Sequence, residues 1–248
     1  MKKFEYTPPE QPRELILKLG QKITDRIGHT VTAEDPEYYG LEALVTDEMA
    51  EVALKMKVRK PMTLAQIVKA TGKEEKVLEE LLQEMSNIGL LEYNWENPKH
   101  EKQYVLPMYV PGSAEFFNMK LDQIKEHPEV ASFFERMAFL PLQKVTPMVP
   151  PGGAGIGMHV IPVEKAIETE NESVSVEHIS HWLDKYDGKY AAGPCSCRYS
   201  RGVLGEGCAD DPEDWCIGVG DMADYLVETN KGHYICLLYT SPSPRDRQ

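Results

Sequence analysis

Four cysteines fall within 22 residues and offer the clearest chemistry in the sequence. They form a close pair followed by two single positions: Cys195, Cys197, Cys208 and Cys216. Cysteines that only fill a core would be scattered, so this clustering indicates a shared local role. Disulfides are a weaker alternative, because the first residues lack the apolar run of an export signal. A metal centre is favoured, since four thiolates can complete a tetrahedral zinc site or hold an iron–sulfur cluster.

The spacing of the cysteines does not decide between zinc and iron. The last two are separated by seven residues, unlike the close pairs of most structural zinc sites, and the ferredoxin run C-x2-C-x2-C-x3-C is absent. Glycines surround the cysteines and would let backbone amides approach the sulfurs. These glycines are Gly193, Gly202, Gly205 and Gly207. Arg198 and Arg201 add positive charge, and we expect Arg198 to lie beside the cofactor and offset thiolate charge.

The end of the chain bears on the cysteine count. The eleven residues from Cys236 to Asp246 resemble the translation of a transposon-type sequencing adapter; a natural Pro/Ser-rich tail is the alternative. We therefore leave residues 236–248, with the fifth cysteine, out of the fold prediction, and we expect the natural polypeptide to continue past Ile235. Without this tail the net charge changes from −13 to −14, because two arginines and one aspartate are removed.

The charge balance limits the classes of partner. The chain has 27 Lys and Arg against 40 Asp and Glu, and its 42% hydrophobic content is that of a folded globular protein. So acidic a chain argues against DNA as a partner unless a local basic face exists. No run approaches the roughly 18 to 20 apolar residues that a membrane span needs. We therefore expect a cytoplasmic protein that does not bind membranes.

A regular pattern of helices and strands begins near residue 45. Apolar residues at helical spacing predict three short helices over residues 47–56, 63–71 and 74–88. The third has the strongest apolar stripe, with Val77, Leu78, Leu81, Leu82 and Met85 facing inward. Two short strands joined by a turn are predicted at 90–93 and 103–106. Three helices followed by a hairpin resemble the winged helix-turn-helix superfamily in pattern, which predicts a winged-helix-like domain over residues 45–107.

The predicted helices carry recognisable end signals. Asp47 and Thr63 are the expected caps of the first two helices. Gly72 and Gly89 are expected to end the second and third. Residues 73–85 of the third helix hold two lysines against five glutamates, a net charge of −3. Such a surface repels a DNA duplex, so we interpret this domain as a packing or docking module.

The stretches on either side of this domain are less regular. Residues 1–44 predict an extended arm and a short helix with Leu15, Ile16, Leu19 and Ile23 on one face, followed by a loop over residues 29–40. Residues 108–172 are rich in proline and predict a connector with one helix near 129–139.

Two further patterns could mark functional sites, but a structural interpretation is favoured for each. The glycine-rich run 150–158 lacks the Lys-Ser/Thr pair of a phosphate-binding loop, so a turning connector is favoured. His178 and His181 share a face of a helix predicted from about residue 173. No third ligand lies near them on that helix, so a solvent-facing position is favoured over a metal site.

Around the cysteines the chain resembles a family of iron–sulfur proteins of anaerobic bacteria and archaea. The shared pattern is C-x-C-R, a single cysteine and P-x-x-x-C-x-x-x-G-x-x-A-x-Y, which runs here from Cys195 to Tyr225. Upstream, the family motifs V-P-G, H-P-E and I-P-[IV]-E-K-A-I are matched at residues 110–112, 127–129 and 161–167. The likeness covers residues 45–235.

The resemblance implies a [4Fe-4S] cluster held by the four cysteines, with Arg198 as a neighbouring cofactor-binding residue. Family members commonly continue into ferredoxin-type repeats, and some into flavin- and NAD(P)-binding domains, so flavin and NAD(P) are expected only in further domains downstream. The implied partners are other redox domains or subunits. No catalytic residue is identified in the chain itself.

These patterns together predict an α+β, mainly helical fold, in which the winged-helix-like domain precedes an irregular cysteine-rich metal-binding segment over residues 173–235. The leading hypothesis is an iron–sulfur electron-transfer module of a larger anaerobic oxidoreductase. Two alternatives stay open. One is a winged-helix regulator that senses metal or redox state, and the other is a structural zinc-binding domain.

Overall fold

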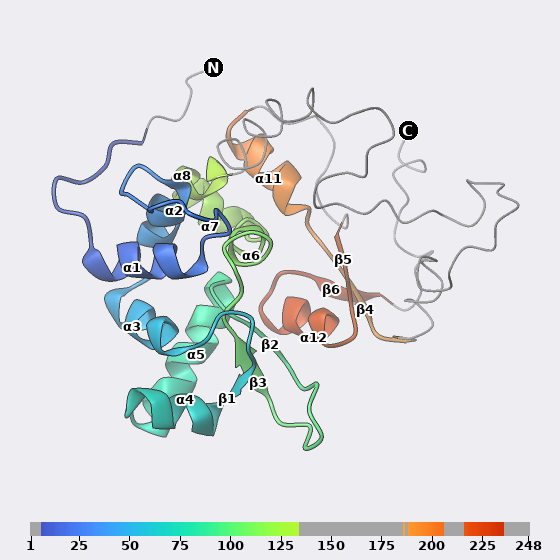
Figure 1. Ribbon diagram of the computed structural model, residues 1–248. Helices are drawn as coiled ribbons and strands as arrows, with labels where there is room; N and C mark the ends of the chain where they lie inside the picture. The colour runs from blue at the N-terminus through green and yellow to red at the C-terminus, as the bar shows by residue number, and fades with distance from the viewer. Residues whose placement is uncertain (1–5, 134–185, 187, 206–215, 236–248) are drawn as a thin grey trace, which may run out of the picture.

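The computed structural model describes residues 6–133, 186, 188–205 and 216–235. Helices predominate in these residues, accompanied by two small three-stranded sheets whose strands pair antiparallel (Figure 1). A mixed α+β, mainly helical class is therefore confirmed.

Helix α1 (Glu14–Ile23) follows the predicted apolar stripe, with Ile16, Leu19 and Ile23 fully buried. The loop predicted over residues 29–40 is wrong in its last part, because helix α2 (Pro36–Leu44) begins within it. Proline suits the first helical turn, where its fixed φ is already helical and its missing N–H has no partner to lose. Apolar residues lie around much of α2, so its sequence lacks the one-sided stripe that marks α1.

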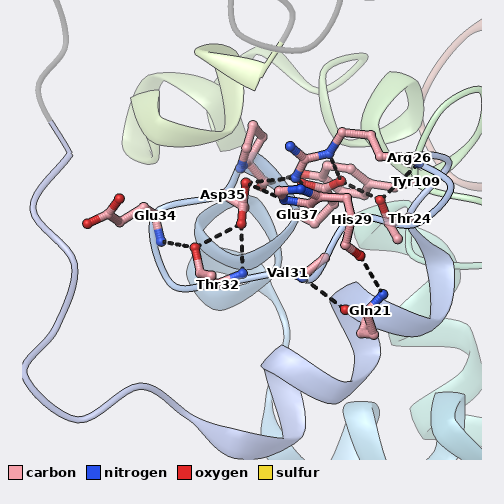
Figure 2. Close-up of polar contacts among 11 residues, drawn as sticks. Gln21, Thr24, Arg26, His29, Val31, Thr32, Glu34, Asp35, Glu37 and Tyr109 are labelled. Atoms are coloured by element: carbon pink, nitrogen blue, oxygen red, sulfur yellow. Dashed lines mark hydrogen bonds and ion pairs between the residues drawn. The ribbon is translucent and has the colours of Figure 1, made fainter.

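A charged cluster closes the loop between α1 and α2 (Figure 2). The guanidinium group of Arg26 donates to both oxygens of the buried Glu37 carboxylate, from Nε to Oε1 at 2.8 Å and from Nη2 to Oε2 at 2.5 Å. Nη2 also lies 2.8 Å from Oδ1 of Asp35. Burial raises the pKa of Asp35, but hydrogen bonds from Arg26, Thr32 and His29 together lower it to about 2. The cluster thereby fixes the start of α2 beside the end of α1.

The next six elements run helix, strand, helix, helix, strand, strand. They are α3 (Asp47–Lys55), β1 (Met62–Thr63), α4 (Leu64–Thr71), α5 (Glu75–Ile88), β2 (Glu92–Asn94) and β3 (Gln103–Val105). All three predicted helices and both hairpin strands are present. The two-residue strand β1 was not predicted, because it is too short to show an alternating pattern. It pairs with β3, which becomes the central strand in the order β1-β3-β2.

The helix ends agree with the sequence signals at three of four positions. Thr63 and Gln66 form a capping box at the start of α4. Gly72 and Gly89 end α4 and α5 with φ values of 71° and 104°, which favour glycine. Asp47 is not the cap of α3. That position belongs to Thr46, whose hydroxyl accepts a hydrogen bond from the Met49 N–H at 3.2 Å.

The inward stripe predicted for α5 is correct except at one edge. Leu78, Leu82 and Met85 are fully buried, whereas the side chain of Val77 is 46% exposed. A helix turns about 100° per residue, so Val77 lies well round the helix from the centre of this stripe.

The predicted connector is helical in the part that the structure describes. Residues 108–133 contain α6 (Ser113–Phe117), α7 (Leu121–Glu126) and α8 (Pro128–Ala131). Their side chains Phe117, Ile124 and Val130 are fully buried. Helices of four to six residues are too short to reveal a 3.6-residue period, which is why the sequence predicted only a helix near 129–139.

The cysteine-rich segment is not irregular in its described part. It contains β4 (Tyr190–Gly193), α11 (Ser196–Val203), β5 (Cys216–Val219), α12 (Asp221–Glu228) and β6 (His233–Ile235), with strand order β5-β4-β6. Small residues permit this compact arrangement. Gly218, for example, lies so close to Leu226 that a Cβ there would overlap its Cδ1 atom at 2.7 Å. Helix α12 therefore packs directly on the sheet.

The hairpin β2–β3 contacts α12 directly (Figure 1). The Tyr93 hydroxyl donates to Oε2 of Glu228 at 2.7 Å. The Tyr93 and Tyr225 rings pack edge to face, with 5.1 Å between their centroids. The backbone N–H of Trp95 donates to Oδ2 of Asp221 at 2.8 Å. The hairpin face is thus occupied by another part of the same chain.

Several predicted features lie outside the described residues. They are the glycine-rich run 150–158, the residues His178 and His181 with their helix, Cys208, and the adapter-like tail 236–248. Among the helices that the structure does describe, none has the length and apolar character to cross a membrane.

Candidate metal centre

The pairing of β4 with β5 brings Cys195 and Cys216 to the same end of the second sheet. Cys216 is the first residue of β5 and lies opposite Gly193, the last residue of β4. Two residues after Gly193, Cys195 occupies the N-cap position of α11, and Cys197 follows in the first turn. Helix α11 packs against α6, α7 and α8, which holds its amino-terminal end at the sheet edge.

The three described thiols interact with one another. Hydrogen bonds from the thiols of Cys197 and Cys216 lower the pKa of the Cys195 thiol far below its ordinary value, against an opposing effect of burial. The same two contacts raise the pKa values of Cys197 and Cys216, because each of these thiols donates to Cys195. The three thiols therefore titrate as one coupled group, in which the loss of one proton is favoured and the loss of the next is opposed.

Ser196 supplies polar hydrogens near two of the sulfurs. The contact with Cys195 has the largest effect on the pKa values of Cys197 and Cys216, and it raises both. The Ser196 hydroxyl lowers the pKa of Cys197, and the Ser196 N–H lowers the pKa of Cys216. Donors of this kind also stabilise thiolates that ligate metals. The sequence prediction that backbone amides approach the sulfurs therefore holds at Ser196.

Arg198 lies in the first turn of α11, next to Cys197. Its backbone N–H donates to the carbonyl oxygen of Cys195 at 3.0 Å and helps to lower the pKa of the Cys195 thiol. The predicted role of its guanidinium group beside a cofactor stays a prediction.

The donor set suits a soft metal, but the described side chains do not form a finished metal site. In residues 6–133, 186, 188–205 and 216–235, no three His, Cys, Asp or Glu side chains are arranged to hold a metal ion. Three thiols nevertheless converge there, and the fourth predicted ligand, Cys208, lies outside those residues. Thiolates are preferred ligands of zinc and of iron–sulfur clusters, so the chemistry of the converging residues fits either group.

Sequence reasoning missed what surrounds the cysteines. Two segments border a pocket beside Gly193 and Pro194. One is residues 119–122, at the start of α7, and the other is residues 230–233, which lead from α12 into β6. Gly193 approaches the second segment so closely that a Cβ would overlap the carbonyl oxygen of Lys231. Residues 193–194 and 230–233 are distant in sequence. The signal that could have indicated their contact is a glycine in each, Gly193 and Gly232, because glycine permits two backbones to approach closely.

No protein-family model, no curated protein and no solved structure matches the chain significantly.

Proposed function

We propose that the chain is an iron–sulfur electron-transfer module of a larger oxidoreductase, with Cys195, Cys197, Cys208 and Cys216 as the cluster ligands. The observation that carries the proposal is the convergence of three of these thiols from three positions: the end of β4, the first turn of α11 and the start of β5. When bound, a cluster supplies one-electron chemistry, because thiolate-ligated iron and sulfide share the added electron.

The residues around the sulfurs support the same proposal. The Ser196 N–H and hydroxyl, together with the N–H groups of Cys197 and Arg198, face thiolate charge. Hydrogen bonds to sulfur are a means by which proteins set the reduction potential of a cluster. Cys197 is exposed, which would place one edge of the centre within reach of a redox partner, another domain or a subunit.

We also propose that residues 45–107 form a winged-helix-like module used for packing. The element order from α3 to β3, and the sheet order β1-β3-β2, favour this assignment. The hairpin contacts α12 through Tyr93 and Trp95, so the surface that would act as a wing is engaged within the chain. The exposed side of α5 presents Glu79, Glu80 and Glu84, which would repel a duplex.

The test is metal analysis of the full chain prepared without oxygen. We expect brown protein with broad visible absorbance, and iron and acid-labile sulfide in comparable amounts. The double variant Cys195→Ser, Cys216→Ser should lose both, whereas Cys236→Ser, a matched change in the adapter-like tail, should keep both. Zinc without colour would replace the proposal by a structural zinc domain. Unchanged iron and colour in the double variant would show that these cysteines are not the ligands.

A further inference from the structure

A pocket of about 470 Å³ opens beside the cysteines, and the proposed electron transfer makes no use of it. Its walls come from the loop 119–122, from residues 193–194 with Tyr199, and from the loop 230–233. Gly193 and Pro194 directly precede Cys195 in the chain, although the described lining residues include no cysteine. A cavity of this size can accept a small organic molecule.

Two lysines that line the pocket share one backbone oxygen. Nζ of Lys231 lies 2.9 Å from the carbonyl oxygen of Asn87, and Nζ of Lys120 lies 3.3 Å from the same atom. Burial disfavours protonation of Lys231, and the two amino groups are so close that a charge on Lys120 disfavours it further. Within the described residues neither lysine forms an ion pair with a carboxylate, although the chain as a whole carries a net charge of −13.

The two lysines differ in what they can offer a ligand. Lys231 is only 1% exposed, and its Nζ already donates to the carbonyl oxygens of Ser86 and Asn87. Lys120 is half-buried and makes one such bond, at Asn87. An ammonium group has three N–H donors, so Lys120 retains donors for a bound anion.

The remaining lining residues define the rest of the ligand. Met119 and Tyr199 are each 7% exposed and provide an apolar surface, and Asn230 adds a polar side chain. Asp122 is the acidic residue of the lining and is exposed to solvent. Its charge would oppose an anion, so the anionic group must bind on the side of Lys120.

We infer that this pocket binds a small organic oxyanion, with its charged group at Lys120 and its apolar body against Met119 and Tyr199. Such a molecule would neutralise the charge of Lys120 and fill the apolar part of the cavity. A phosphate ester and a carboxylate share this chemistry, and the choice between them is made by experiment. The inference does not depend on a metal at the cysteines.

The experiment is calorimetric titration of the full chain with phenyl phosphate, benzoate and inorganic phosphate. We expect saturable binding of an aromatic anion, tighter than that of inorganic phosphate, and the preferred aromatic anion identifies the charged group. Lys120→Gln should weaken binding about tenfold, the usual effect of losing one charge-assisted hydrogen bond. Lys125→Gln removes the same charge from α7, the helix that begins directly after Lys120; Lys125 is not among the lining residues, so this change should leave the affinity unchanged.

Asp122→Asn separates an anion site from a cation site, because it should strengthen the binding of an anion. The inference is overturned by any of three results: no saturable binding of either aromatic anion, equal effects of Lys120→Gln and Lys125→Gln, or weaker anion binding in Asp122→Asn.

Discussion

The Nζ atom of Lys231 lies 2.9 Å from the backbone oxygen of Ser86, a residue 145 positions earlier in the chain. Lys231 belongs to the loop between α12 and β6, and Ser86 to the last turn of α5. The Tyr225 hydroxyl donates to the same Ser86 oxygen at 3.3 Å. The last carbonyl groups of a helix have no partner within the helix, so a buried amino group that donates hydrogen bonds is well placed there. This contact ties the cysteine-bearing sheet to the helical part of the molecule.

Lys231 should make stability depend on pH. Burial, and to a lesser degree the charge of Lys120, lowers its pKa from 10.5 to about 6. Between these two pH values the unfolded chain binds a proton at Lys231 that the folded chain does not bind. The contribution of Lys231 to the free energy of unfolding therefore rises with pH above about 6 and is constant below it. Relative to Lys231→Met, the wild type should gain up to about 1.4 kcal/mol per pH unit above pH 6. Denaturant unfolding of both proteins measures this difference.

Lys125→Met is the control for this experiment, because Lys125 is exposed on α7. Its unfolding free energy should run parallel to that of the wild type over the same range. Parallel curves for Lys231→Met as well would contradict a lowered pKa at Lys231.

The pairing of Arg26 with Glu37 should be costly to break from one side. The Glu37 side chain is fully buried, so Arg26→Met leaves its carboxylate without a compensating charge (Figure 2). We expect a loss of about 3–5 kcal/mol in unfolding free energy. Adding Glu37→Gln to Arg26→Met should recover part of this loss. Lys18→Met breaks the exposed pair with Glu14 and should change stability by less than about 1 kcal/mol. Equal losses of unfolding free energy in Arg26→Met and Lys18→Met would contradict this prediction.

Gly40 should tolerate no side chain while Tyr109 is present. A Cβ at Gly40 in α2 would overlap the Tyr109 hydroxyl oxygen, whereas the ring atom Cζ would lie at 3.3 Å. Gly40→Ala alone should therefore destabilise the protein by about 1–3 kcal/mol. Tyr109→Phe removes the overlapping oxygen at the expense of its hydrogen bond to the Pro36 carbonyl. A double-mutant cycle measured by thermal unfolding should show that Gly40→Ala is less harmful in the Tyr109→Phe background; strict additivity would contradict the overlap.

The contact between the hairpin and α12 should appear as an energetic coupling. Tyr93→Phe and Glu228→Gln each weaken the 2.7 Å hydrogen bond between the two side chains. The two changes together should destabilise the protein by about 1 kcal/mol less than the sum of the single changes. Lys99→Gln, in the turn of the hairpin, is a control that should show no coupling to Glu228→Gln. A coupling of zero at Tyr93 would mean that this bond adds nothing to docking.

The regular helices were the most predictable part of the fold. The stripe and end signals of α4 and α5 are local, so Thr63, Gly72 and Gly89 could be placed from sequence alone. Helix α2 was not predicted at all, because its buried tyrosines give no one-sided pattern and Pro36 is as typical of a loop as of a helix start. Helices α6 and α7 were missed because five or six residues cannot display a period, whereas α8 overlaps the helix predicted near 129–139.

The cluster of cysteines could be predicted from the sequence, but the residues that surround it could not. Clustering in sequence was enough to select Cys195, Cys197 and Cys216, and the structure brings their thiols together. The pairing of β4 with β5, the docking of Lys231 on α5 and the pocket at Lys120 depend on contacts across 23 or more residues of sequence. No local pattern encodes such contacts.

The register Gly193↔Cys216 has a consequence for the proposed metal centre. The backbone ladder places Cys216 opposite the strand that leads into Cys195, so these two residues are held near each other before any metal would bind. In the proposed centre they would form a preorganised chelate, and metal binding would cost less chain entropy than in a site that folds around its metal. Metal binding and the stability of the sheet would then be thermodynamically linked: fraying of these strand ends would weaken metal binding, and a bound metal would oppose the fraying.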